Sequence, residues 1–254
     1  MNAIFAIVKL TFKEIVRKKD FYVALALIGV ILFFASRMNF YDVENVSRYL
    51  RELGLALIFV FSAFITVPLA ARQFPSETRD RTLAVLLAKP VSRGQFVLGK
   101  FLGAALAGVA AFTVFYAVFL AFTLKGLPDP RVAVQAGILF AMGLAVLAAV
   151  ATGLSFYLTF SANVMITLAV YLLMIAYGPD LRDFFNGTSA PVRMAGEVLY
   201  YGLPHFEFFD LRQRFIHDWG TVSTRLVCGV YLYGVCYTGF FLLIGWLKLR
   251  RTAA

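Results

Sequence analysis

Arg72–Lys100, which reads RQFPSETRDRTLAVLLAKPVSRGQFVLGK, is a 29-residue polar interruption between two apolar runs, Leu53–Ala71 and Phe101–Leu124. Each run is about as long as the roughly 20 apolar residues that a helix needs to cross a bilayer. The two runs therefore predict membrane-spanning helices, and the interruption predicts a loop on one side of the membrane.

The composition of the whole chain supports a membrane protein, because 61% of its 254 residues are hydrophobic and only 15% are charged. A soluble core of this size does not need so much apolar surface. We expect an all-α integral membrane fold in which residues 1–254 form one transmembrane domain with six spans, give or take one. The six apolar runs are Phe21–Ala35, Leu53–Ala71, Phe101–Leu124, Val132–Gly153, Asn163–Gly178 and Leu226–Leu247.

The distribution of charge orients this bundle. With six spans both termini share one side, and the loops predicted there hold fourteen basic and four acidic residues, whereas the other loops balance. Lys and Arg accumulate on the cytoplasmic side of bacterial-type membranes. We therefore expect a multi-pass protein of a bacterial or archaeal cytoplasmic (inner) membrane with both termini in the cytoplasm. The net charge of +10 indicates contact with anionic lipid headgroups rather than nucleic acid.

Residues 1–20 predict a helix that lies in the membrane interface. Apolar residues recur at helical spacing, while Lys9, Lys13 and Arg17 repeat every four residues on another face. Lysines at such a position reach lipid phosphates while the apolar side sinks among the acyl chains. The alternative is a positive-inside anchor that only orients the first span.

The polar interruption contains a candidate helix. Ser76 can cap it, and Glu77 and Asp80 suit the positive end of its dipole. Leu83, Leu86 and Leu87 form an apolar ridge on one side, and Pro90 stops the helix. An exposed leucine ridge needs a cover, which is either the protein's own bundle, the lipid surface or the cleft of a soluble partner.

Gly94–Lys100, GQFVLGK, matches most of a phosphate-binding loop, but Phe101 stands where that motif needs Ser or Thr for magnesium. We therefore expect no nucleotide on this chain.

The polar interruption shows a family resemblance at particular residues: Glu77, Thr82-Leu83, Leu86-Leu87, Pro90-Val91-Ser92-Arg93 and Gly99-Lys100. These residues resemble the cytoplasmic segment between the second and third spans of ABC type-2 transporter permeases. The most similar subgroup is the six-span exporter permeases that include those linked to copper-enzyme maturation. Arg81 departs from the pattern, because many members have Gly before the Thr-Leu pair.

The resemblance implies a permease in which residues 1–20 form an elbow helix and residues 72–100 hold a coupling helix that enters a groove on an ATPase subunit. It implies ABC ATPase subunits, a second permease copy or homologue and membrane lipids as partners. This chain would then be no enzyme and bind no cofactor, with ATP and Mg on the partner subunit. The implied docking residues are Glu77, Thr82, Leu83, Leu86, Leu87, Pro90, Ser92 and Arg93.

Within the six apolar runs we find no Asp, Glu, Lys, Arg or His, although ion-driven carriers place such residues at depth. Polar residues in the spans remain as candidates for a substrate path or for hydrogen bonds between helices: Thr66, Thr113, Tyr116, Thr167 and Tyr171. Small residues at every fourth position from Gly137 to Gly153 favour close helix packing, either within the chain or with a second copy.

The long segment 179–225, predicted on the outer side, contains His205, Glu207, Asp210 and His217, types that can bind a transition metal. They form no compact ligand motif, so we expect no metal. Aromatic residues in this segment predict short amphipathic helices at the outer leaflet, and in the family such a region caps the outer mouth of the path.

These observations favour the permease subunit of an ATP-driven transporter, and the resemblance implies that it is an exporter. Two alternatives stay open: a membrane anchor or assembly subunit that transports nothing, and a lipid-modifying enzyme that depends on His205, Glu207 or Asp210.

Overall fold

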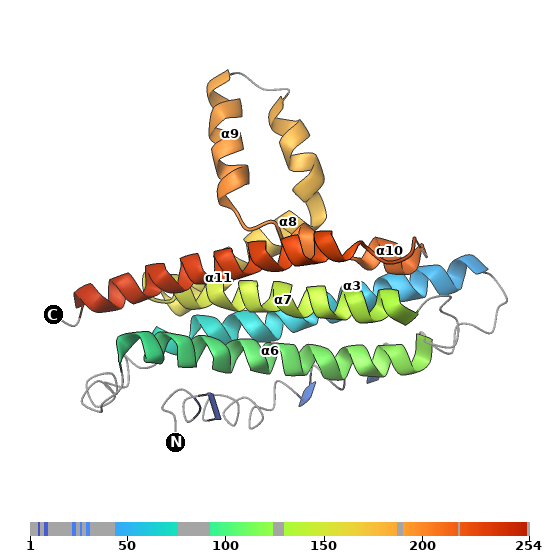
Figure 1. Ribbon diagram of the computed structural model, residues 1–254, viewed down its shortest axis with the longest axis horizontal. Helices are drawn as coiled ribbons and strands as arrows, with labels where there is room; N and C mark the ends of the chain where they lie inside the picture. The colour runs from blue at the N-terminus through green and yellow to red at the C-terminus, as the bar shows by residue number, and fades with distance from the viewer. Residues whose placement is uncertain are drawn as a thin grey trace.

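The computed structural model describes residues 44–75, 92–123, 130–186, 190–217 and 219–252, together with eight single positions among the first thirty. Every element in these described ranges is a helix (Figure 1). In chain order they are α3 Glu44–Ala71, α6 Arg93–Thr123, α7 Pro130–Leu154, α8 Phe160–Asn186, α9 Ala190–Gly202, the short 3₁₀ helix η3 Phe206–Phe209, α10 Arg212–Ile216 and α11 Thr224–Thr252.

Five of these helices are long and apolar enough to cross a membrane. They coincide with the second to sixth predicted runs and cover Glu52–Pro75, Arg93–Ala121, Pro130–Leu154, Phe160–Gly178 and Thr224–Arg251. The first predicted run, Phe21–Ala35, lies mostly outside the described residues. The sixth span therefore stays a prediction.

The polar interruption is shorter than the sequence indicates, because α6 begins at Arg93 rather than at Phe101. Ser92 and Gln95 cap this helix reciprocally. The Gln95 N–H donates to Ser92 Oγ at 3.2 Å, and the Ser92 N–H donates to Gln95 Oε1 at 3.1 Å. Gly94–Lys100 therefore forms the first turns of a helix and not a loop that wraps a phosphate.

The spans alternate in direction, so the end of α3, the start of α6, the turn at 155–159 and the end of α11 lie together. We call this the inner end of the bundle and the opposite one the outer end. Figure 1 shows α3, α6, α7 and α11 side by side along the long axis.

Helix α7 forms the centre of the bundle and packs against α3, α6, α8 and α11. On it, the ring of Phe140 stacks on Phe59 of α3 with centroids 3.5 Å apart and meets Phe112 of α6 at 4.7 Å. Gly137 lies against Tyr116 of α6, and Gly153 lies against α11. The small residues of α7 therefore provide close packing within this chain.

The part of the chain that follows the membrane span Phe160–Gly178 of α8 divides into two parts (Figure 1). The outer portion of α8 and α9 form a helical hairpin that stands away from the bundle. Residues 203–216, which include η3 and α10, return to the bundle and pack against α3, α7 and α8. We call 203–216 the re-entrant segment.

The re-entrant segment is anchored by four apolar side chains that are at most 2% exposed: Phe206, Phe209, Phe215 and Ile216. Phe209 contacts Gly143, about 20 Å along α7 from its start at 1.5 Å per residue. The sequence predicted that short helices in segment 179–225 lie at the outer leaflet. Phe209 instead reaches the middle of α7, so residues 203–216 enter the bundle. Burial of four large side chains stabilises the inserted position.

Candidate functional site

The start of α6 is tied to the end of α11 at the inner end of the bundle. Arg93 Nη1 donates a hydrogen bond to the backbone carbonyl of Arg250 at 2.9 Å. One residue further, Gly94 lies against the ring of Trp246, over which the Arg250 guanidinium is placed at 5.6 Å. A displacement of the α6 start therefore acts directly on α11.

The end of α3 is held by a different contact. Phe74 packs on Phe156 in the turn between α7 and α8, with ring centroids 4.5 Å apart. The next residue in that turn, Tyr157, donates from its hydroxyl to the Ile244 carbonyl at 3.2 Å and lies under the ammonium of Lys248. Both flanks of residues 76–91 are thus attached to a common platform of helix ends.

Most of the predicted docking residues, namely Glu77, Thr82, Leu83, Leu86, Leu87 and Pro90, lie outside the described residues. Ser92 and Arg93 are described and lie at the start of α6 on this platform. In the predicted elbow, Lys9 is helical and exposed, whereas Lys13 and Arg17 lie outside the described residues.

Four of the five candidate path residues have hydrogen-bond partners within the chain. Thr66 and Thr113 donate to carbonyls four residues earlier in their own helices, Ser62 at 2.7 Å and Val109 at 2.8 Å. The Tyr116 hydroxyl donates to the Ala133 carbonyl at 2.8 Å, which joins α6 to α7. Hydrogen bonds within the bundle therefore explain why these three side chains are polar, without a contact to substrate.

The fourth, Thr167, belongs to a buried network that the sequence did not suggest. Its hydroxyl donates to Asn163 Oδ1 at 3.0 Å, and Asn163 Nδ2 donates to the Ala151 carbonyl at 2.8 Å. The network joins α7 and α8 beside the inner turn. The sequence did contain a signal for this network, namely Asn163 at the start of an apolar run, because a buried amide needs hydrogen-bond partners in a membrane.

Tyr171, the fifth, differs from the others. Its side chain is only 2% exposed, its ring contacts Phe206 of the re-entrant segment at 5.3 Å, and its hydroxyl has no hydrogen-bond partner among the described residues. Tyr171 therefore places an unused donor where α8 meets the re-entrant segment.

The re-entrant segment adds charged groups to a bundle whose spans contain few. Arg212 donates to Asp210 Oδ2 from Nε at 2.7 Å and approaches it from Nη2 at 2.6 Å. The guanidinium also lies over the ring of Phe59 at 5.5 Å. Asp210 and Arg212 thus form a largely buried ion pair within the segment, and Arg212 packs it against α3.

His205 and Glu207 lie on the same segment near α9 and α11. The backbone N–H of His205 donates to the Tyr233 hydroxyl at 2.8 Å, and burial lowers the pKa of the His205 ring. Glu207 accepts a hydrogen bond from Tyr200, while burial raises the pKa of its carboxyl group. Both groups are therefore biased towards their neutral forms.

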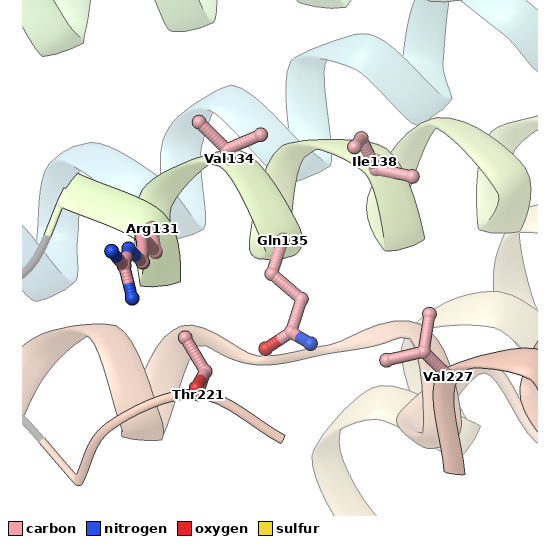
Figure 2. Close-up of a pocket in the computed structure, with 6 residues that line it drawn as sticks. All are labelled: Arg131, Val134, Gln135, Ile138, Thr221 and Val227. Atoms are coloured by element: carbon pink, nitrogen blue, oxygen red, sulfur yellow. The ribbon is translucent and has the colours of Figure 1, made fainter. Parts of the chain in front are cut away.

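A groove opens at the outer end between the start of α7 and the stretch that leads into α11 (Figure 2). Gln135 bridges it, because its Nε2 donates to the Val222 carbonyl at 2.9 Å and its Oε1 accepts from the Val222 N–H at 2.8 Å. The remaining lining is mostly apolar. We interpret the groove as the seam that fixes this stretch to α7.

Among the residues that the structure describes, no three His, Cys, Asp or Glu side chains gather as metal ligands. His205, Glu207 and Asp210 instead have separate neighbours: Tyr233, Tyr200 and Arg212, respectively.

Five apolar helices, four of them packed around α7, with an inserted segment at the outer end, define a multi-pass α-helical membrane protein. Residues 5–179 match the family described as ABC-2 family transporter protein. The chain belongs to this family, and it is a transmembrane permease of an ABC transporter. A comparison with curated proteins found no match.

Proposed function

We propose that this permease is an exporter subunit moved by separate ABC ATPase subunits that dock on the segment between α3 and α6. The observation that supports the proposal is the platform at the inner end. There the start of α6 is bonded to α11 through Arg93, and the end of α3 is packed on the α7–α8 turn through Phe74. A force applied to residues 76–91 would reach α3, α6, α11 and the turn between α7 and α8 through contacts already in place.

The proposed arrangement puts the inner end in the cytoplasm, where ATPase subunits have access to ATP and Mg. The described part of this end is basic, with Arg93, Lys100, Lys248, Arg250 and Arg251, which agrees with a cytoplasmic location. The proposed docking residues stay those of the leucine ridge and its flanks. A second copy or homologue of the permease completes the transporter, and catalysis belongs to the ATPase subunits alone.

The mechanism we propose is a shift between two arrangements of the spans. Closure of the ATPase subunits would push the docking segment, and α6 and α11 would follow together because Arg93 joins them. The re-entrant segment would respond at the outer end, since it packs between α3, α7 and α8.

Leu86→Asp is expected to abolish co-purification of the ATPase subunit, because a carboxylate on the ridge would be buried unpaired in the partner's cleft. The measurement is affinity purification of the detergent-solubilised chain from its native host, followed by an ATPase assay and mass spectrometry of the accompanying proteins. Leu86→Met, which keeps the ridge apolar, is the matched control and should retain the ATPase. If no ATPase accompanies the wild-type chain, or if the ATPase is indifferent to Leu86→Asp, the protein is better explained as a membrane anchor.

Arg93→Ala is expected to reduce the stimulation of ATP hydrolysis by the permease, measured on complexes that retain the ATPase, by a factor of up to about five. The factor corresponds to a hydrogen bond worth about 1 kcal/mol, and its loss weakens the attachment of the α6 start to the end of α11. The readout is ATPase activity of the reconstituted complex. Arg225→Ala, at the opposite end of α11, is the control. Unchanged stimulation in Arg93→Ala would show that this bond does not transmit the movement.

A further inference from the structure

The two oxygens of the Glu207 carboxyl group have different surroundings. It accepts a hydrogen bond from the Tyr200 hydroxyl of α9. Its other oxygen, Oε2, is buried and has no hydrogen-bond partner among the described residues. One oxygen of this acid is thus partnered, and the other is removed from water without a donor.

Gly178 of α8 creates the space for that oxygen. A Cβ at position 178 would overlap Glu207 Oε2 and crowd the carboxyl carbon. The carboxyl group therefore rests directly on the backbone of α8, in a notch that only glycine provides.

The described charged and titratable neighbours do not supply a cation to this notch. Tyr200 faces Glu207 from α9, and Tyr233 faces it from α11. On its own segment, the ring of His205 is biased towards the neutral form by burial, and Arg212 is bound by Asp210. An ionised carboxylate would leave a charged oxygen in the notch without a counter-charge.

A neutral carboxylic acid fits the same place. Protonation removes the negative charge from the carboxyl group. Burying the uncharged oxygen in the notch costs less than burying a charged one.

We propose that Glu207 is a proton-binding site that couples docking of the re-entrant segment to protonation. In the docked arrangement seen here Glu207 is held between Tyr200 and the Gly178 notch, where it binds a proton more tightly than it does in water. When the segment leaves the bundle and Glu207 meets water, the O–H bond breaks, the electron pair stays on the carboxylate and the proton passes to water. Redocking takes one proton up. The inference concerns the chain alone and does not depend on the proposed ATPase partners.

The raised pKa of Glu207 fixes the direction of the pH dependence. Protons favour the docked arrangement, and this stabilisation is fully present below the ordinary Glu pKa of about 4.3. It is lost as pH rises through the raised pKa of the docked state. Within that window, the ratio of docked to withdrawn segment should fall by up to about tenfold for each pH unit.

The direct test is infrared spectroscopy of the full chain in lipid nanodiscs without nucleotide. A protonated carboxyl band should persist in the wild type above the pH range in which an exposed Glu ionises, and it should disappear in Glu207→Gln. Glu197→Gln is the matched control, because Glu197 is an exposed glutamate paired with Arg193 at 2.9 Å, and it should leave the band unchanged. Absence of the band in the wild type, or a band insensitive to Glu207→Gln, would overturn the proposal.

Two further measurements connect the proton to the movement. Hydrogen exchange of residues 203–216, corrected for its intrinsic pH dependence, should speed up with rising pH in the wild type and not in Glu207→Gln, where the neutral amide mimics the acid. Gly178→Ala should remove this carboxyl band although the glutamate is still present, because the methyl group expels it from the notch. Equal pH dependence in wild type and Glu207→Gln, or an unchanged band in Gly178→Ala, would contradict the coupling.

Discussion

Gly153→Ala is expected to destabilise the bundle, whereas the same substitution at Gly229 is expected to stabilise it slightly. A Cβ at position 153 of α7 would lie 2.5 Å from the backbone carbonyl oxygen of Phe241 in α11. A backbone atom cannot rotate away, so the two helices would have to separate. Gly229, on α11, has open space around the same position.

The two substitutions differ in the sign of their effect on the melting temperature. Overpacking costs about 1–3 kcal/mol, which lowers the melting temperature of a protein of this size by roughly 5 °C. Ala in place of an exposed helical Gly gains up to about 1 kcal/mol. Thermal unfolding of both variants in one detergent gives the comparison. Equal melting temperatures would mean that α7 and α11 are not in such close contact.

Asp210→Ala is expected to cost about 3–5 kcal/mol, because it leaves the guanidinium of Arg212 buried over Phe59 without its counter-charge. The corresponding fall in melting temperature is about 10 °C. Asp210 also accepts the backbone N–H of Arg212 at 2.9 Å, so the turn that begins α10 loosens as well.

A second variant separates the loss of charge balance from the loss of the contact. Asp210→Ala combined with Arg212→Met removes both charges and keeps an apolar side chain against Phe59. It should recover most of the stability, since the cost of breaking a buried pair lies mainly in the charge that remains. Glu197→Ala, which breaks the exposed pair with Arg193, should change stability by less than about 1 kcal/mol. If the double variant is as unstable as Asp210→Ala, the unpaired charge of Arg212 is not the reason for the loss of stability.

The sequence predicted the places of the five described membrane-spanning helices well, but their ends less well. Val132–Gly153 agrees with α7 within two residues, because the run is predominantly apolar, follows Arg131 and ends shortly before Ser155. For α6, the polar residues Arg93, Gln95 and Lys100 suggested a loop, although they form the first turns of the helix. The first residue of α6 is determined by the Ser92 cap and by the contact with α11, and a hydropathy profile shows neither of them.

The candidate site was less accessible from sequence. Thr66, Thr113, Tyr116 and Thr167 were singled out because they are polar, yet each has a partner within the chain. Residue type could not distinguish them from Tyr171, whose hydroxyl has none among the described residues. That difference depends on which helix lies opposite, so only the packed structure could reveal it.

What the sequence determined by itself is the class of protein, its apolar runs and the uneven distribution of its charge. These are local properties, because the bilayer acts as a solvent on each helix separately and an apolar run of sufficient length is enough to span it. The tertiary structure alone decided that residues 203–216 enter the bundle. This depends on complementary shapes far apart in the chain, with Phe209 against Gly143 and Glu207 against Gly178. For that reason a chain without ionisable residues in its apolar runs still places a carboxylic acid against the backbone of α8.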